Sequence, residues 1–378
     1  MMSGTKKIKI LHSTLTNNMG GIEAFLSNLT KDIYALNNDS DTKVEFSFLM
    51  NGENIEIEKK FTDFGCKIYH TPRFFQGYSA FIKKLLLENN YDYVHVHKNS
   101  AAEIILPKLV KKYSHATLVV HSHNTLPSLS SVPTRFLHRL NQKKLFDLAD
   151  YRFACSKEAG KWLFGTNRPT DSYRVINNGI DTQSYEYNEV IRKKTRDALN
   201  LNDGNFLFGN VGRLAEQKNQ AFLIKSFAKV IRKRPEARLI IVGGGEKAPE
   251  LEQLKESLGL QEKVFLVGSS QRVSDYLQAM DAFVLPSLYE GLGISMVEAE
   301  ASGLPIFVSD TVPDDGKVSD LVRVLPCNDE DSWVSAMMKA SPNIYRHDYA
   351  KRVADAGYDM HQTASVLYNF YLQKAQTE

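Results

Sequence analysis

Short apolar runs rich in β-branched and aromatic residues alternate along this chain with longer amphipathic stretches. In the first half, these runs predict strands over 9–12, 44–49, 93–97, 117–121, 151–154 and 173–176. Helical patterns separate them, including 22–36, 80–88 and 101–113. Strands that alternate with helices are typical of a parallel sheet with helices on both faces, so this half is predicted to be one doubly wound α/β domain.

The second half repeats the alternation after a polar, charged interval. Apolar runs resume at Phe206, and further strands are predicted over 238–242, 264–267, 282–285 and 306–309. The chain is therefore predicted to form two Rossmann-like domains, residues 1–185 and 200–350, with a C-terminal helix, about 355–378, that packs back on the first. Because such sheets bind ligands beyond the carboxyl ends of their strands, the site is expected in a cleft between the domains.

Length, charge and cysteine content narrow the class of protein. A chain of 378 residues exceeds the usual size of one core, and a formal charge of +3 from 47 basic and 44 acidic residues does not indicate nucleic-acid binding. The cysteines Cys66, Cys155 and Cys327 suggest neither a disulfide framework nor a zinc site. No signal-peptide pattern and no apolar run of ~18 residues is seen. A cytoplasmic protein is expected.

The segment from Pro286 to Pro305 carries the most chemical information. It joins an apolar strand to a turn with Gly291 and Gly293, and then to a predicted helix that bears Glu298. Glycines let backbone N–H groups approach a ligand, and a phosphate is the anion expected at a helix N-terminus. Glu290 and Glu298 would lie ~12 Å apart along this helix, so they suit two separate diols of one elongated ligand. Considered alone, a helix cap and a solvated surface residue would be the simpler interpretation.

Two other turns follow predicted strands. Arg213 and Lys218 are cations five residues apart that a turn could direct at a diphosphate, although loop cations are usually solvated. In the first half, Gly20 and Gly21 form a strand-to-helix turn whose backbone could approach a phosphate. An ordinary glycine turn without a ligand would have the same sequence pattern.

His123 lies two residues after His121, at the end of a valine-rich strand. The two rings share one side only if the strand continues through both residues. They could then bind a metal ion, but no carboxylate or cysteine lies nearby in the sequence. A histidine that contacts substrate is favoured over a metal ligand.

Taken in order, these motifs resemble the retaining GT-B glycosyltransferases of family 4. The shared motifs are Gly-Gly-Ile-Glu from Gly20, His-Ser-His-Asn from His121, Asn-Gly-Ile-Asp from Asn178, Gly-Arg at 212–213, Lys-Asn at 218–219, and Glu290 with Glu298. Their order and spacing match over essentially the whole chain. The segment Tyr-Glu-Gly-Leu-Gly, followed by 308–313, looks closest to the branch that assembles capsular or exopolysaccharide repeats.

The resemblance implies a GT-B fold and a role for each matching residue. Arg213 and Lys218 would hold the donor diphosphate, Glu298 the ribose and Glu290 the transferred sugar. The residues implied in catalysis are His123, Glu290, Arg213 and Lys218. The residues implied in donor binding are Gly20, Gly21, Arg213, Lys218, Arg272, Val273, Glu290, Gly291, Gly293 and Glu298.

The implied reaction is transfer of a hexose or N-acetylhexosamine from a UDP-sugar to a surface-polysaccharide precursor, with a lipid-linked glycan as the acceptor partner. The anomeric configuration would be retained, because the acceptor hydroxyl would attack the sugar on the same face from which the phosphate leaves. No metal ion or other cofactor is expected, because fixed cations would neutralise the leaving group. Asp39 and Asp41 form an Asp-x-Asp pattern, but their polar surroundings favour a solvated loop. Ile294 and Asn124 depart from the family's usual proline and aspartate, which leaves the sugar open.

Other functions remain to be weighed. Gly243, Gly245 and Ala248 fit a dinucleotide-binding fingerprint, but the next strand ends in Gly268 and Ser269 where an acidic residue would be expected. A nucleotide-sugar hydrolase or epimerase would share the donor pocket and need no acceptor. A sugar-nucleotide sensor would need the pocket alone.

A basic and apolar segment over 135–146 could lie on anionic lipid. Arg135, Arg139, Lys143 and Lys144 occur there at helical spacing among apolar residues. Such contact would place the protein peripherally at the inner face of the cell membrane. An ordinary amphipathic helix packed on its own sheet explains the pattern equally well.

Overall fold

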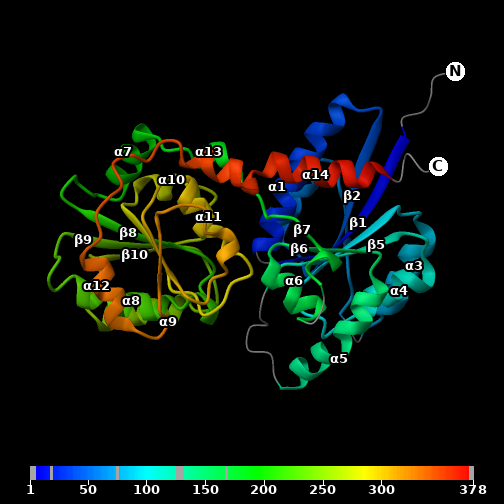
Figure 1. Cartoon of the computed structure of the whole chain (residues 1–378), viewed down its shortest axis with the longest axis horizontal. Coiled ribbons are helices and arrows are strands. Elements are labelled where there is room, and N and C mark those ends of the chain that lie inside the picture. The colour runs from blue at the N-terminus through cyan, green and yellow to red at the C-terminus, as the bar shows by residue number, and fades with distance from the viewer. Residues whose placement is uncertain (1–5, 18–19, 74–75, 125–131, 167–168, 374–378) are drawn as a thin grey trace. The chain divides into compact units, whose positions relative to one another are not determined.

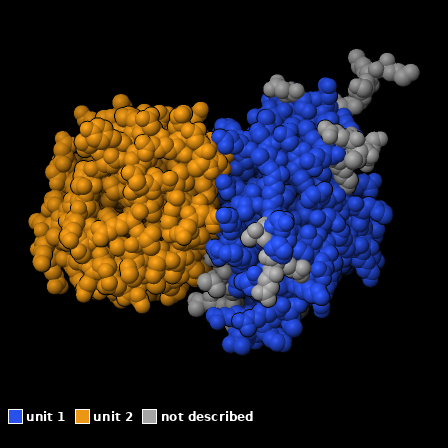
Figure 2. Space-filling view, viewed as in Figure 1, with its two compact units in different colours: residues 1–179, 360–378 blue, residues 180–359 orange. Residues whose placement is uncertain are grey.

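The computed structural model describes residues 6–17, 20–73, 76–124, 132–166 and 169–373. The chain forms two compact units, which Figure 2 shows in different colours. Unit 1 contains residues 1–179 and 360–378, and unit 2 contains residues 180–359. The boundary therefore precedes residue 180 rather than following residue 185, and the chain re-enters unit 1 at Met360 rather than near residue 355.

Unit 1 is built on a seven-stranded sheet in the order β3-β2-β1-β4-β5-β6-β7 (Figure 1). All paired strands are parallel. The strands are β1 (Lys6–Thr16), β2 (Thr42–Asn51), β3 (Lys67–His70), β4 (Tyr93–Lys98), β5 (Thr117–Ser122), β6 (Tyr151–Ala154) and β7 (Arg174–Val175). Central strands such as β4 and β5 are buried almost throughout, as expected for a sheet that helices cover on both faces.

The connections of unit 1 are mostly helical. The helices are α1 (Gly21–Leu36), α2 (Ile55–Thr62), α3 (Tyr78–Glu88), α4 (Ile105–Tyr113), α5 (Val132–Leu148), α6 (Lys157–Phe164) and α14 (Met360–Leu372). Asn54 and Ser156 cap α2 and α6 through their side-chain oxygens, which satisfies backbone N–H groups of the first turn. In the part of the chain that the structure describes, no helix combines the length and the apolar character needed to cross a bilayer.

The last helix of the chain returns to unit 1, as predicted, but it is shorter than the predicted segment. A helix α13 (Tyr349–Val353) and a π-helical turn (Ala354–Tyr358) precede α14. Gly357 has a φ of 87°, a left-handed conformation that ends the helical path before α14. Phe370 and Tyr371 of α14 enter the core of unit 1, so this helix completes that core.

Unit 2 is built on a six-stranded parallel sheet in the order β10-β9-β8-β11-β12-β13. The strands are β8 (Phe206–Val211), β9 (Ala237–Val242), β10 (Val264–Gly268), β11 (Ala282–Leu285), β12 (Ile306–Ser309) and β13 (Val322–Leu325). The other helices are α7 (Glu189–Ala198), α8 (Gln220–Val230), α9 (Ala248–Ser257), α10 (Val273–Ala279), α11 (Ile294–Ala301) and α12 (Glu330–Met338). Phe208 and Leu239 enter one core cluster, and Leu207 and Ile240 enter another, as alternation along a strand requires.

Strand order reverses once in each sheet. β1 lies between β2 and β4, and β8 lies between β9 and β11, so successive connections leave in opposite directions from β1 and β4 and from β8 and β11. In such sheets, ligands bind beyond the carboxyl ends of the two strands at the reversal. The topology therefore directs attention to residues that follow β1, β4, β8 and β11.

Candidate functional site

Two loops of unit 2 meet at the strand-order reversal. One follows β8 and contains a 3₁₀ turn (Glu216–Lys218), and the other follows β11. The N–H of Leu288 donates to the carbonyl of Gln217 at 2.8 Å, and the Gln217 amide donates to the carbonyl of Tyr289 at 3.0 Å. The Asn219 amide donates to the carbonyl of Pro286 at 3.2 Å. These bonds fix one loop against the other.

Lys218 and Glu290 form an ion pair between the two loops. Their Nζ and Oε1 atoms lie 2.6 Å apart, and the side chains are 14% and 7% exposed. Gly212 leaves room for the lysine, since a Cβ there would lie 3.0 Å from Lys218 Cε. The structure thus brings together a cation and a carboxylate that the sequence separates by 72 residues.

The loop after β11 leads into the start of α11. Gly293 precedes the helix with a φ of 81°, and a Cβ there would lie 3.2 Å from Val312, so glycine suits both the conformation and the space. The hydroxyls of Ser309 and Thr311 donate hydrogen bonds to the carbonyl of Ser287, the latter at 2.6 Å, and so fix the start of this loop to the residues at the end of β12. Gly291 is buried in the same loop. A braced loop followed by a helix N-terminus favours an anionic group.

Glu298 projects from α11 and accepts a hydrogen bond from the Tyr185 hydroxyl at 2.8 Å. Part of its surface is accessible, yet protein atoms surround the carboxyl group. Burial raises the pKa of Glu298 from 4.5 to about 7, against the opposing effects of Tyr185 and the Lys218 charge. Lys218 therefore acts on both acids, and Lys218, Glu290 and Glu298 form one cluster.

Arg213, Arg272 and Val273 are placed differently. The guanidinium of Arg213 pairs with Glu246 at 3.0 Å, and both side chains are 55% exposed. Arg272 lies at the start of α10, beyond β10, and pairs with Asp275 at 3.0 Å. Val273 is the first residue of that helix. Both arginines are on the surface, so a ligand could recruit them without breaking a buried contact.

The glycine turn of unit 1 is closed by a buried acid. Glu23 accepts hydrogen bonds from the backbone N–H groups of Thr16 and Gly20, both at 3.0 Å, and from the Thr16 hydroxyl at 2.8 Å. A Cβ at Gly20 would lie 2.8 Å from Glu23 Oε2, whereas one at Gly21 would meet no atom of the described residues within 4 Å. The turn is a rigid start to α1, and its contact with a phosphate stays a prediction.

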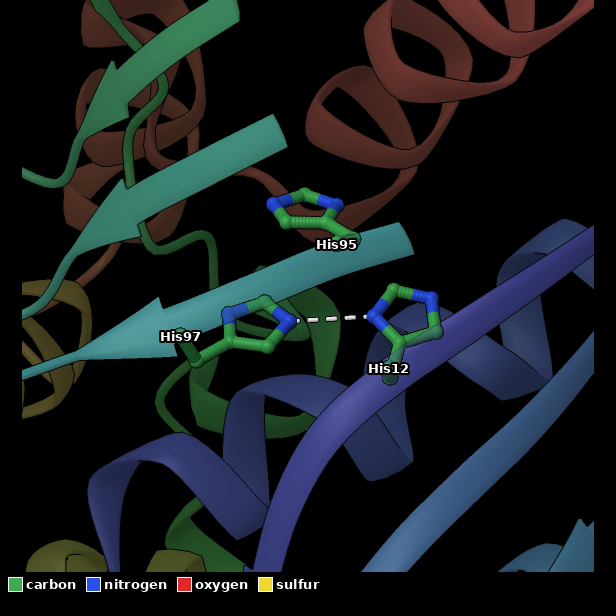
Figure 3. Close-up of side chains that lie close together, drawn as sticks. All are labelled: His12, His95 and His97. Atoms are coloured by element: carbon green, nitrogen blue, oxygen red, sulfur yellow. Dashed lines mark hydrogen bonds between the residues drawn. The ribbon is translucent and has the colours of Figure 1, made fainter. Parts of the chain in front are cut away.

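His123 belongs to a cluster of five buried histidines in unit 1. Both His121 and His123 contact Phe25 of α1, with ring centroids 5.9 and 5.6 Å away, so their rings share one side of the sheet. Their neighbours His12, His95 and His97 come from β1 and β4, and Figure 3 shows these three rings close together. Burial lowers the pKa of His12 and of His123 to about 3, so both rings are neutral at physiological pH.

Metal binding at the cluster is sterically conceivable. Within the described ranges, His12, His95 and His97, and likewise His97, His121 and His123, have ring nitrogens within 4.8 Å of one another. Neutral imidazoles are the form that binds Zn²⁺ or Cu²⁺. However, no carboxylate among the described residues belongs to either group. Both ring nitrogens of His97 are already hydrogen-bonded, one to His12 and the other to His123.

Four residues that contribute to these sites were not predicted from the sequence. Tyr185 reaches Glu298 from a 3₁₀ turn (Thr182–Tyr185) that the sequence assigned to the first domain. His12, His95 and His97 were read only as strand residues. The spacing of two in both His95–His97 and His121–His123 was the available signal, because neighbouring strands then present all four rings on one face.

The glycine-rich turn after β9 has a packing role. A Cβ at Gly243 would lie 2.0 Å from the carbonyl oxygen of Gly212, and one at Gly245 would lie 2.3 Å from that of Leu214. The N–H of Leu214 donates to the carbonyl of Gly244 at 2.9 Å. These glycines let the backbone of the loop after β8 pack closely against this turn. Close packing therefore explains the glycine pattern of the dinucleotide-binding fingerprint without a bound dinucleotide.

Comparison with known sequences matches two family models to the chain. Residues 20–184 match the family described as Glycosyltransferase Family 4, and residues 191–356 match the family described as Glycosyl transferases group 1. The chain therefore contains a domain of each of these two glycosyltransferase families. The two matched segments correspond closely to the two α/β units of this glycosyltransferase.

Relatives and a solved structure extend the comparison. The glycosyltransferase is 27% identical to EpsF of Bacillus subtilis over 98% of this chain and 97% of EpsF. It is 28% identical to the UDP-Gal:alpha-D-GlcNAc-diphosphoundecaprenol alpha-1,3-galactosyltransferase of Escherichia coli over 68% of each chain. The crystal structure of Anabaena HepE in complex with UDP and glucose aligns with a TM-score of 0.74 and 18% identity, covering 96% of this chain and 99% of HepE. The fold is GT-B.

Gly243→Ala should destabilise unit 2. The methyl group would collide with the Gly212 carbonyl, and a φ of 150° at residue 243 disfavours alanine, so we expect a loss of about 3 kcal/mol in the free energy of unfolding. Urea denaturation measures it. Gly244→Ala is the control, because its methyl group would meet only the Ser269 hydroxyl, which can rotate. Equal stability of the two variants would contradict the packing role.

Glu298→Gln should change how stability depends on pH. The folded pKa of about 7 lies above the ordinary 4.5, so folding favours the protonated acid, and stability is full below pH 4.5 and falls as pH rises through 7. Glutamine has no proton to lose, so the variant should lack about 2 kcal/mol of the decline between pH 5 and 8. Urea denaturation at four pH values measures the decline. Tyr185→Phe keeps the acid but removes its hydrogen bond, so the decline of stability with pH should be steeper in this variant. Parallel stability profiles for the wild type and both variants would contradict a raised pKa at Glu298.

Proposed function

We propose that this protein is a retaining glycosyltransferase that moves a hexose or N-acetylhexosamine from a UDP-sugar to a lipid-linked polysaccharide precursor. The observation that carries the proposal is the cluster of Lys218, Glu290 and Glu298 beside the N-terminus of α11. One cation, two separated acids and a helix N-terminus match the alternating charges and hydroxyls of a nucleotide sugar.

The leaving diphosphate would be stabilised by groups of unit 2. Lys218 is held by its ion pair with Glu290, so its ammonium is already positioned when the donor arrives. Arg213 can leave Glu246 at little cost, because exposed ion pairs contribute only ~0–1 kcal/mol. With the first N–H groups of α11, these cations would neutralise the charge that develops as the glycosidic bond breaks.

The two acids would bind the two sugars of the donor. Glu298 retains part of its surface and can accept hydrogen bonds from ribose hydroxyls once ionised, while Tyr185 fixes its orientation. Glu290 would exchange part of its bond to Lys218 for a hydroxyl of the transferred sugar. Buried, positioned acceptors discriminate strongly against ligands that lack the matching hydroxyl.

Retention and metal independence complete the proposal. The departing phosphate would act as the base that accepts the proton of the acceptor hydroxyl on the same face of the sugar. Fixed cations supply the neutralisation that a metal ion would otherwise provide. Printed names of relatives support the donor and acceptor classes: the Escherichia coli relative is named for UDP-galactose and a diphosphoundecaprenol acceptor, and HepE was crystallised with UDP and glucose.

Lys218→Met should lower kcat for glycosyl transfer by about 100- to 1,000-fold, because the leaving diphosphate loses its positioned cation. Radiolabelled UDP-sugars and a lipid-linked acceptor provide the assay. The control is Lys229→Met, since Lys229 on α8 forms an equally short pair of 2.6 Å with Glu330. The double variant Lys218→Met with Glu290→Gln leaves no unpaired acid, and recovery of normal activity in it would contradict the role of Lys218.

A nucleotide-sugar hydrolase or epimerase would share this donor site. Product analysis separates the functions, because a transferase releases UDP faster when acceptor is added and gives a product with the anomeric configuration of the donor. UDP release that ignores the acceptor, or a free epimerised nucleotide sugar, would replace the proposal with one of these alternatives.

A surface of α5 supplies a second part of the proposal, contact with an anionic membrane. Val132, Phe136 and Leu140 recur every four residues and are 80%, 61% and 53% exposed. The basic residues Arg135, Arg139, Lys143 and Lys144 are exposed among them. The opposite side is fixed to unit 1, where His138 stacks on Trp162 with centroids 4.0 Å apart. Large exposed apolar side chains beside basic residues suit a bilayer with negative headgroups, where the lipid-linked acceptor would reside.

Charge reversal on α5 should weaken binding to vesicles. Replacing Arg135, Arg139 and Lys143 by glutamate removes about 1 kcal/mol of attraction per basic residue near the membrane. We expect flotation with phosphatidylglycerol vesicles to fall at least tenfold at low salt. The matched control replaces Lys225, Arg232 and Lys233, exposed basic residues of unit 2. Equal flotation of both variants, or binding that ignores anionic lipid, would reject this surface.

A further inference from the structure

Five histidines occupy one core layer of unit 1. In strand register, His12 of β1 pairs with His95 of β4, and His97 pairs with His121 of β5, so the layer crosses the strand-order reversal. His123 extends it past the end of β5. Phe25 of α1 and Tyr371 of α14 cover this layer, and Tyr371 bonds His95 Nδ1 at 2.6 Å.

Three of these rings form a hydrogen-bonded chain. His12 Nδ1 lies 3.0 Å from His97 Nε2, and His97 Nδ1 lies 2.8 Å from His123 Nε2. The ring planes of His12 and His97 differ by 17°, and their centroids are 5.3 Å apart. This distance exceeds the nitrogen–nitrogen distance by about two ring radii, so the two nitrogens lie on the line between the centroids. The contact is therefore edge to edge in the plane of the rings, the geometry of a well-aligned hydrogen bond, and Figure 3 shows the bond from His97 to His12.

The chain couples the tautomers of its members. Each ring is neutral, because burial lowers the pKa of all three histidines, and a neutral imidazole carries one N–H group. His97 bonds through both nitrogens, so it must donate to one neighbour and accept from the other. Only two patterns satisfy both bonds: all three rings protonated on Nδ1, or all three protonated on Nε2.

The interior end of the chain selects between these patterns. His12 is fully buried against Phe46 and Phe48, and its Nε2 atom has no partner among the described residues. A buried N–H group without an acceptor is rarer in proteins than a bare acceptor. Protonation of His12 on Nδ1 avoids such a group at the apolar end, and the coupling then places the protons of His97 and His123 on Nδ1 as well. The N–H group left without a partner among the described residues then belongs to His123, at the carboxyl end of β5, where ligands of doubly wound sheets bind.

We propose that the chain His12–His97–His123 fixes His123 as the Nδ1–H tautomer, so that it presents a hydrogen-bond donor at the carboxyl end of β5. Nδ1 of His123 is buried and has no partner within the described part of the chain, and the residue is 9% exposed, more than the other four histidines. The ligand it suits is an oxygen acceptor, a hydroxyl or phosphate oxygen of the sugar nucleotide. His12 and His97 are positioning residues. The identity of the ligand rests on the proposed function; the coupling of the three tautomers does not.

Histidine ¹⁵N NMR tests the tautomers directly in the wild-type protein. The ring-nitrogen shifts of His12, His97 and His123 should all be those of Nδ1–H imidazole. Different tautomers at His97 and His123 would overturn the chain, and Nε2–H throughout would overturn its direction. This measurement needs neither substrate nor variant.

A matched pair of variants tests the coupling. His97→Phe removes the donor that bonds His123 Nε2, and the Nδ1–H fraction of His123 should fall severalfold. The control is His121→Phe, whose ring lies only 4.1 Å from that of His123 between centroids but forms no part of the chain. A larger change in His121→Phe than in His97→Phe would overturn the proposal.

Kinetics and metal titration separate the remaining outcomes. His97→Phe should lower kcat about three- to tenfold, the effect of one hydrogen bond, while binding of UDP by unit 2 is unchanged. If no UDP-sugar is turned over, the proposed function fails but the NMR result still decides the chain. Micromolar binding of Zn²⁺ or Co²⁺ that His97→Phe abolishes would instead show a metal site and overturn the proposal.

Discussion

Strand-order reversal is the constraint on which both sites depend. At the reversal, two neighbouring parallel strands send their connections in opposite directions, so the space beyond their carboxyl ends is not filled by either connection. In unit 2 this brings the loops after β8 and β11 together, and the ion pair of Lys218 and Glu290 joins them. In unit 1 the same reversal places His12 of β1 beside His95 of β4. Neither arrangement requires a special loop length, because the topology alone makes the strand ends adjacent.

Burial sets the protonation state of both sites, in opposite directions for acids and bases. Removing a charged group from water disfavours its charged form, so the pKa of Glu298 rises and the pKa values of the histidines fall. Lys218 partly offsets the effect at Glu298, which leaves that acid close to a balance between two forms near neutral pH. Among the described residues, the histidines have no compensating partner of opposite charge, and they are neutral. Unit 2 therefore offers charge to a ligand, whereas unit 1 offers neutral donors and acceptors.

The sequence was sufficient for the elements and for much of the charged site. Strands β6, β11 and β12 have the predicted bounds, because buried parallel strands are continuous apolar runs bounded by polar residues. β3 and β13 were not predicted, since both are short edge strands with a largely accessible face and weak apolar character. Glycine and charge at strand ends revealed Lys218, Glu290 and Glu298. Tyr185 could not be found this way, because its role depends on where a turn far away in the sequence is docked. The histidine chain required the order of the strands, which pattern alone does not supply.

Stability alone does not account for the histidine layer. Valine or phenylalanine would fill the same inward positions of β1, β4 and β5, and the neighbouring residues Phe46, Phe48 and Phe153 show that the layer accepts apolar side chains. Five ring nitrogens in the layer lack a partner among the described residues, and each such atom costs ~1–3 kcal/mol. Sequences retain unfavourable local choices of this kind mainly at functional sites. The proposed direction of the hydrogen bonds is consistent with a functional role. The donor of the last ring, His123, then lies at the carboxyl end of β5, where a ligand of a doubly wound sheet binds, and the unpartnered nitrogen of His12 lies at the apolar end.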